Sequence, residues 1–133
     1  MPVAADSSVV LDVLLDDPEF RAGSQVLLER HLGTGAVLLS SIAFAECATA
    51  LRPTSEFARL AAEMGLTFDV LDPDTCALAA HQWRAYRAAG GPRRRILADF
   101  LIGAHAQTRT GVLLTRDRGF YRDYFTGLEI RSP

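Results

Sequence analysis

The sequence contains no lysine, and its fourteen basic residues are all arginine. This absence excludes reactions that need a lysine amine. Only two cysteines are present, Cys47 and Cys76, which is too few for a disulfide framework. Both lie in Ala-rich helical patterns, so we expect them to be buried thiols rather than metal ligands. Because no apolar run approaches the ~20 residues of a membrane span, we expect no membrane association.

Basic residues are also scarce in the first half of the chain. Residues 1–66 carry four Arg against nine Asp and Glu, whereas residues 67–133 carry ten Arg against seven. A weakly acidic chain with a basic second half is not typical of a protein that coats DNA nonspecifically. It does permit a local phosphate-binding surface. The first residues lack the basic region of a signal peptide, so we expect a cytoplasmic protein.

What the chain does contain is an alternation of short apolar runs and helical patterns, over a length that fits a single domain, 1–133. The apolar runs predict strands at 2–6, 36–39, 67–71, 112–114 and 128–130. The periodic stretches predict helices at 7–14, 18–32, 40–51, 54–64, 74–88 and 96–106, and a turn is expected after Asp117. Strands that alternate with helices favour an α/β fold, with a mostly parallel sheet between two layers of helices.

Four carboxylates occupy comparable places in this pattern. Asp6 and Asp117 directly follow apolar strands, Glu46 lies early in the helix after the second strand, and Asp99 lies near the start of another helix. Each alone has a structural explanation, as a helix cap, an exposed helix residue, a first-turn residue or a turn former. In a parallel sheet, however, all four positions fall at one edge, outside the carboxyl ends of the strands, where ligands bind.

Carboxylates that converge on one edge repel each other. Two unit charges roughly 4 Å apart cost about 1 kcal/mol in water and up to about 4 kcal/mol at an effective dielectric of 20. A divalent cation would remove this penalty. Since the set offers only oxygen ligands, it suits Mg²⁺ or Mn²⁺ better than Zn²⁺. We therefore predict a metal site made by Asp6, Glu46, Asp99 and Asp117.

Four segments carry a family resemblance. They are Asp6-Ser7-Ser8 after the first strand, Ser-Ile-Ala-Phe-Ala-Glu ending at Glu46, Asp99 with Leu-Ile-Gly-Ala-His-Ala, and Leu-Leu-Thr-Arg-Asp ending at Asp117. Together they resemble the PIN-domain nucleases over nearly the whole chain. The short single-domain form, with Phe120-Tyr121 after the last acid, is similar to VapC-type ribonuclease toxins of toxin–antitoxin pairs. The resemblance implies a five-stranded parallel sheet in which the first and fourth strands are adjacent.

The resemblance also implies an activity, which is metal-dependent hydrolysis of an RNA phosphodiester. The four carboxylates would hold one or two Mg²⁺ or Mn²⁺ ions, directly or through water, so that a bound water is activated and charge on the phosphate is stabilised. Ser7 and Thr115 are candidates to orient a carboxylate or a water by hydrogen bonds. We assign none of the three histidines to catalysis.

Several partners follow from the same resemblance and from the charge pattern. The candidate contacts to the RNA backbone are Arg93, Arg94, Arg95, Arg116 and Arg118, for which solvated surface charge is an equally good explanation. The family suggests a cognate antitoxin whose C-terminal segment wraps the toxin and offers a basic residue to the acidic pocket. It also suggests a homodimer. The Ala-rich helix at 54–64 is a candidate contact for the antitoxin.

Three alternatives remain open at this point. A PIN-domain nuclease of RNA processing, without a toxin role, would use the same residues. A catalytically silent PIN-like protein that binds RNA or acts as a scaffold would share the fold. A phosphoacceptor receiver domain is also doubly wound with clustered acids, but it needs an active-site lysine, and this sequence has none.

Overall fold

Five parallel strands form one sheet in the computed structural model, which describes residues 1–92 and 95–133. The strands are β1 (Val3–Ala5), β2 (Val37–Ser40), β3 (Leu66–Asp69), β4 (Val112–Leu114) and β5 (Glu129–Arg131). Their order across the sheet is β3-β2-β1-β4-β5. The chain therefore changes direction across the sheet between β1 and β4. The predicted adjacency of the first and fourth strands is confirmed.

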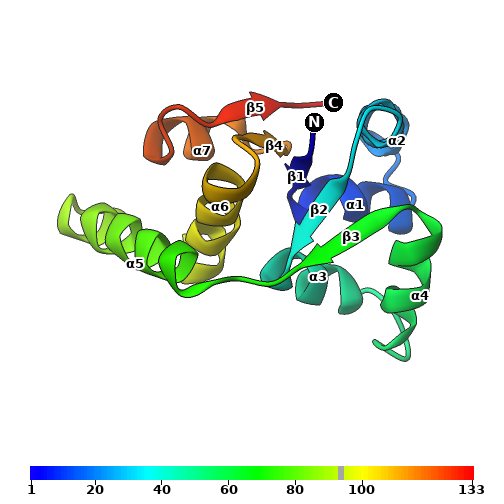
Figure 1. Ribbon diagram of the computed structural model, residues 1–133, viewed down its shortest axis with the longest axis horizontal. Coiled ribbons are helices and arrows are strands. Elements are labelled where there is room, and N and C mark those ends of the chain that lie inside the picture. The colour runs from blue at the N-terminus through cyan, green and yellow to red at the C-terminus, as the bar shows by residue number, and fades with distance from the viewer. Residues whose placement is uncertain (93–94) are drawn as a thin grey trace.

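Helices cover both faces of this sheet. Those in the described residues are α1 (Ser7–Leu14), α2 (Arg21–Leu32), α3 (Ser41–Ala48), α4 (Glu56–Glu63), α5 (Pro73–Ala88), α6 (Leu97–Arg109) and α7 (Arg118–Tyr124). Figure 1 shows α1–α4 on one side of the strands and α5–α7 on the other. Right-handed crossovers explain this division, since connections that step toward β3 pass over one face and those that step toward β5 pass over the other. The predicted three-layer α/β fold is confirmed.

The two strands at the centre of the sheet form the core. Every residue of β1 and β4 is buried, which accounts for their continuous apolar runs. The helix α6, which carries one of the predicted acids, is anchored beside them by Phe100. The ring centroids of Trp83, Tyr86, Phe120 and Tyr124 lie 5.1–6.0 Å from that of Phe100. This cluster joins α5, α6 and α7 into one layer.

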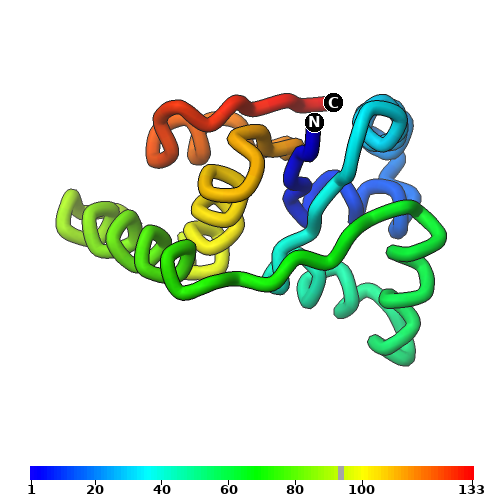
Figure 2. Tube along the Cα trace, in the orientation of Figure 1, coloured from blue at the N-terminus to red at the C-terminus, as the bar shows by residue number. Residues whose placement is uncertain are grey.

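Both chain ends lie against the region of α2, as the tube in Figure 2 shows. The amino group of Met1 donates a hydrogen bond to the carbonyl oxygen of Thr34, at 3.2 Å. The approach is so close that a Cβ on Gly35 would lie 2.5 Å from the Met1 carbonyl oxygen. At the other end, Pro133 lies against Gly23 of α2. No helix in the described part of the chain has both the length and the apolar character that crossing a membrane requires.

Two expectations about this fold were wrong. Residues after Asp117 form the helix α7 rather than a turn, and that helix places the rings of Phe120 and Tyr124 on one face, against Phe100. Cys76 is exposed on α5, whereas Cys47 is buried as expected. Burial raises the pKa of the Cys47 thiol to about 12.

Candidate active site

The site begins where the carboxyl ends of β1 and β4 meet. Ala5 pairs with Leu114 in the parallel ladder, and the backbone N–H of Asp6 donates to the carbonyl of Leu114 at 2.9 Å. Asp6 is the N-cap residue of α1, but its side chain makes no capping hydrogen bond. The carboxylate is therefore available at the sheet edge, at the point where the strand order reverses. Ligands of open α/β sheets bind at such points.

Three hydroxyl groups surround the Asp6 carboxylate, which is only 7% exposed. Thr115 donates to it at 2.7 Å, Ser8 at 3.2 Å and Ser7 at 3.4 Å. Burial raises the pKa of Asp6 above its usual 3.8; the hydrogen bonds from the hydroxyl groups oppose this rise, and the charge of Asp99 adds to it. A nearby cation would therefore strongly favour the ionised form of the Asp6 carboxyl group.

Glu46 comes to the same place from α3. That helix begins at Ser41 because the Ser40 hydroxyl accepts a hydrogen bond from the N–H of Ala43, at 3.1 Å. The Ser7 hydroxyl lies 2.9 Å from a Glu46 oxygen and 3.4 Å from an Asp6 oxygen, so it lies between the two carboxylates. The pKa of Glu46 is raised above its usual 4.5. Burial is the main cause and the charges of Asp6 and Asp99 add to it, while the hydrogen bond from Ser7 opposes it.

The other two acids are held by different local contacts. Asp99 lies in the first turn of α6, where its carboxylate accepts a hydrogen bond from the N–H of Ile96 at 3.0 Å. The N–H of Asp117 donates to the Thr115 hydroxyl at 3.0 Å. Since that hydroxyl also donates to Asp6, Thr115 connects the residues that follow β1 and β4. The carboxylate of Asp117 forms an ion pair with Arg95.

Tyr121 is a buried phenol within electrostatic range of the four acids. Its side chain, on α7, is almost completely buried. Burial, and then the charges of Asp6, Asp99, Asp117 and Glu46, raise the pKa of its phenol well above 10. Our sequence interpretation did not include Tyr121 in the site, although its position one helical turn after Asp117 was an available signal.

The donor set fits a hard divalent cation, with one restriction. In the parts of the chain that the structure describes, no three Asp, Glu, His or Cys side chains lie close enough together to form a ready ligand cluster. Mg²⁺ usually keeps several of its waters and takes only one or two protein carboxylates, so a looser group of oxygens still suits it. Burial is the main reason why the pKa values of Asp6 and Glu46 are raised, and neighbouring carboxylates add to it, so a bound cation would lower both.

The predicted RNA-contacting arginines have separate surroundings. Arg95 pairs with Asp117 and stacks on Phe120, with its Cζ 4.3 Å from the ring centroid. The Arg116 guanidinium pairs with Asp12 at 2.9 Å rather than with one of the four acids. Arg118 is exposed at the start of α7. Arg93 and Arg94 lie outside the described residues.

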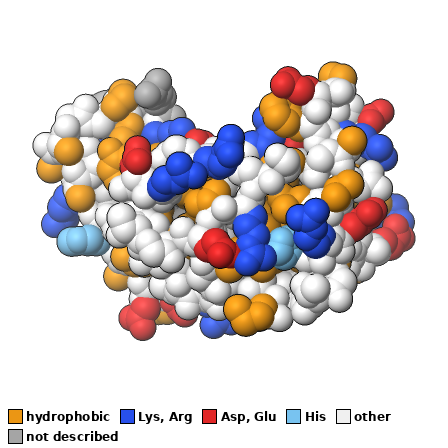
Figure 3. All heavy atoms as spheres, turned by 90° about the horizontal axis from the view of Figure 1, so that it is seen from above, with side chains coloured by type: hydrophobic (Ala, Val, Ile, Leu, Met, Phe, Trp, Pro, Cys, Tyr) orange, Lys and Arg blue, Asp and Glu red, His pale blue; other side chains and the backbone are white. Residues whose placement is uncertain are grey.

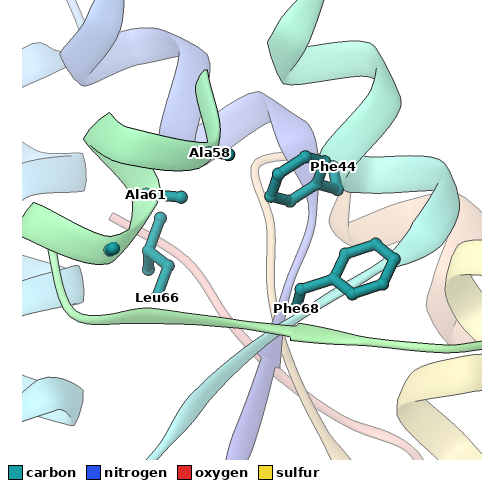
Figure 4. A pocket seen from close by; sticks show the side chains of 6 residues that line it. Phe44, Ala58, Ala61, Leu66 and Phe68 are labelled. Carbon is teal, nitrogen blue, oxygen red and sulfur yellow. The ribbon is translucent and has the colours of Figure 1, made fainter. Parts of the chain in front are cut away.

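An apolar groove lies on another part of the surface (Figure 4), with a volume of about 440 Å³. Its walls come from α3, α4 and β3, and its lining residues are Phe44, Ala58, Ala61, Ala62, Leu66 and Phe68. The rings of Phe44 and Phe68 meet at a centroid distance of 5.0 Å. Phe68 is 51% exposed, which is unusual for a phenylalanine and leaves an apolar face open to solvent.

Comparison with known proteins identifies the family. Residues 3–125 match the PIN domain, so the chain belongs to the PIN domain family. The crystal structure of VapBC2 from Rickettsia felis bound to a DNA fragment from their promoter is similar, with a TM-score of 0.79 and 14% identity over 100% of this chain and 99% of that chain. VapBC-1 from nontypeable Haemophilus influenzae gives a TM-score of 0.72 and 15% identity over 99% and 98%. No curated protein sequence matches the chain.

Proposed function

We propose that this PIN-domain protein is a metal-dependent endoribonuclease and the toxin of a type II toxin–antitoxin pair. The observation that supports the nuclease proposal is the set of hydroxyl contacts at one sheet edge: Ser7 lies between Asp6 and Glu46, and Thr115 joins Asp6 to the backbone of Asp117. Asp6 is a buried carboxylate whose side-chain hydrogen-bond partners are neutral hydroxyl groups, and a buried charge without a counterion is costly. Binding of Mg²⁺ or Mn²⁺ would offset this cost.

The chain's own residues would divide the work at this site. When bound, the metal ion would make a water molecule more acidic and stabilise negative charge on the scissile phosphate. Asp6 and Asp117 would hold it, with Thr115 orienting both residues through its hydroxyl. Asp99 would add its carboxylate from α6. Glu46, with its raised pKa and a single hydroxyl partner, is the carboxylate best suited to accept a proton from water.

RNA is the substrate that we infer, because an exposed phosphodiester backbone needs basic contacts beside the acids. Arg95 forms an ion pair with Asp117, and Arg118 directly follows Asp117 in sequence. We include Arg93 and Arg94 in the same proposal because they precede Arg95. Figure 3 shows basic side chains beside a notch in the face that carries β5 and the chain ends. Single-stranded RNA could enter along such a rim.

A protein antitoxin is the partner that we propose, and the apolar groove is its docking surface. The two solved structures named above are VapBC complexes, and the groove leaves Phe68 51% exposed. An apolar segment of the antitoxin would cover Phe68 and fill the space between α4 and β3. The Ala side chains of α4 keep this space open, since larger residues would occupy it. We also retain the homodimer as a proposal.

The nuclease proposal is tested with Asp6→Asn and Asp99→Asn in an RNA cleavage assay with excess Mn²⁺. We expect each variant to lose at least about 100-fold in rate, because each loses an anionic ligand of the cation. Asp74→Asn is the matched control, since Asp74 is an exposed first-turn acid on α5, outside the candidate site. Full activity in both site variants, with unchanged folding, would contradict the proposal.

The toxin role needs a separate test. Expression of the wild-type protein in a bacterial host should arrest growth, and expression of Asp6→Asn should not. Cleaved RNA ends sequenced after induction would identify the substrate. Nuclease activity in the purified protein without growth arrest would favour an RNA-processing role instead.

A further inference from the structure

Asp12 is a buried carboxylate that the proposed reaction does not use. It lies on α1 with only 2% of its surface exposed. The Ser24 hydroxyl of α2 donates to it at 2.6 Å, and the Nε of Arg116 lies 2.9 Å from its carboxylate. The guanidinium of Arg116 also stacks on Phe20, with its Cζ 4.2 Å from the ring centroid. The carboxylate is thus buried, whereas the Arg116 side chain that balances its charge is 35% exposed.

The position of Arg116 in the chain indicates that role. It lies between Thr115, which donates to Asp6, and Asp117, which is one of the four acids. Its backbone N–H donates to the Ser8 hydroxyl at 3.4 Å, and Ser8 itself donates to Asp6. Ser8 and Asp12 are one turn apart on α1, so they lie on the same helix face. That face therefore holds Arg116 twice, through its backbone and through its side chain.

The segment 115–117 is fixed unequally at its two ends. Thr115 is held on β5 through its N–H, which donates to the Arg131 carbonyl, and through its carbonyl, which accepts from Ser132. Past Thr115 the segment is held by side-chain contacts rather than by a strand. The Asp117 N–H donates to the Thr115 hydroxyl, and the Asp117 carboxylate pairs with Arg95. The Arg116 side chain links the segment to Asp12 of α1, alongside the hydrogen bond from its backbone N–H to Ser8.

We propose that Asp12 and Arg116 are positioning residues for the acidic site: their ion pair fixes the segment after β4, so that the Thr115 hydroxyl and the Asp117 carboxylate face Asp6. This inference rests on the proposed metal site. It gives Arg116 a role other than the phosphate contact expected from sequence, since its charge is balanced by Asp12 within the protein.

The test compares the cation affinity of variants in the full-length protein. Mn²⁺ binding is measured by titration calorimetry for Asp12→Asn, Arg116→Met, the double variant and Arg116→Lys. We expect each single neutral variant to bind Mn²⁺ about 10- to 100-fold more weakly, as for other groups that orient metal ligands. The double variant should be no weaker than either single one, because both remove the same interaction. Arg116→Lys should recover part of the affinity.

A matched control separates positioning from general stability. Asp69 also follows a strand, β3, and pairs with Arg109 of α6 at 2.9 Å and with His105 at 2.8 Å, but it supports none of the four acids directly. Asp69→Asn should lower the unfolding midpoint and leave the Mn²⁺ affinity unchanged. If Asp12→Asn and Arg116→Met behave like Asp69→Asn, the positioning role is refuted.

A second readout does not need the ion. Hydrogen exchange of the Asp117 N–H in the metal-free protein should be at least about tenfold faster in Arg116→Met than in wild type, and unchanged in Asp69→Asn. If wild type binds no Mn²⁺, the proposed function fails, and exchange alone then decides whether the pair fixes the segment. Unchanged exchange would overturn the inference. So would a shallower salt dependence of RNA binding in Arg116→Met, which would assign Arg116 to phosphate.

Discussion

Replacement of Thr115 by valine tests the connection between the two strands that carry Asp6 and Asp117. The Thr115 side chain is fully buried. Its hydroxyl donates to Asp6 at 2.7 Å and accepts from the N–H of Asp117 at 3.0 Å. Valine has nearly the same shape, so the variant keeps the packing and removes only the polar atom. Both partners then lose a hydrogen bond.

The cost follows from the chemistry of the two bonds. A hydrogen bond to a charged group contributes about 1.5–3 kcal/mol, and one between neutral groups about 0.5–1.5 kcal/mol. Since Ser7 and Ser8 still donate to Asp6, we expect the lower part of the combined range, about 2–3 kcal/mol. At roughly 4 °C per kcal/mol for a protein of this size, the unfolding midpoint should fall by about 8–12 °C.

Thermal and urea unfolding of the metal-free protein measure this loss, with Thr115→Ser as the control. Serine keeps the hydroxyl and loses one buried methyl group, worth about 0.8 kcal/mol. The valine variant should also bind Mn²⁺ about 10- to 100-fold more weakly, whereas the serine variant should bind nearly as wild type does. A valine variant as stable as the serine variant, with the same Mn²⁺ affinity, would refute the role of the hydroxyl.

Three further predictions concern other parts of the molecule. Arg95→Gln removes the cation paired with Asp117, so Mn²⁺ affinity should rise severalfold in a calorimetric titration; a fall would mean that Arg95 holds the acid in place. The pKa of Asp69 lies below its usual 3.8. Burial raises this pKa, but the hydrogen bonds from an arginine and a histidine of α6 together outweigh burial and lower it. Its stabilising effect is thus present above about pH 4 and lost as the pH falls through the folded value, so in urea unfolding Asp69→Asn should be less stable than wild type at pH 7 and closer to it at pH 2. Gly103→Val should cost about 1–3 kcal/mol in urea unfolding, because a Cβ there would lie 2.4 Å from the Phe125 ring; unchanged stability would show that the ring moves aside.

The sequence predicted best the strands that are covered by other elements on both faces of the sheet. β1 and β4 were recognised from continuous apolar runs because both strands are buried on both faces. The edge strand β3 was predicted at 67–71 but runs Leu66–Asp69. Its length is set by its neighbour β2, whose last residue Ser40 pairs with Asp69. Val70 continues the apolar pattern but has no strand to pair with, so it is exposed.

The helix α7 shows the opposite case, in which local signals were misleading. A turn was expected there because Asp117 is of a residue type that often forms turns. The segment is helical because Phe120 and Tyr124 pack together on Phe100, a residue of α6 that lies far away in sequence. Packing on a distant residue outweighs a weak local preference, and a single sequence does not reveal it.

The site was predictable in part for the same physical reason. Parallel strands bring their carboxyl ends to one edge, so the positions of Asp6 and Asp117 followed from the order of strands and helices. Thr115 was also expected to orient a carboxylate, and its hydroxyl does donate to Asp6. The contact of Asp12 with Arg116 was not predicted, because it joins opposite ends of the chain and no periodic pattern marks such a pair.

The raised pKa values connect the site to the stability of the fold. Burial raises the pKa of Asp6 above 3.8 and that of Glu46 above 4.5. A carboxyl group with a raised pKa in the folded state favours folding only while it is protonated, so its contribution weakens as the pH rises through these values. At neutral pH the two groups therefore destabilise the metal-free fold. A bound cation reverses that effect and adds about 2.7 kcal/mol at a concentration 100 times its dissociation constant. On the proposed function, the charge arrangement that costs stability in the metal-free protein would be the source of its affinity for the cation.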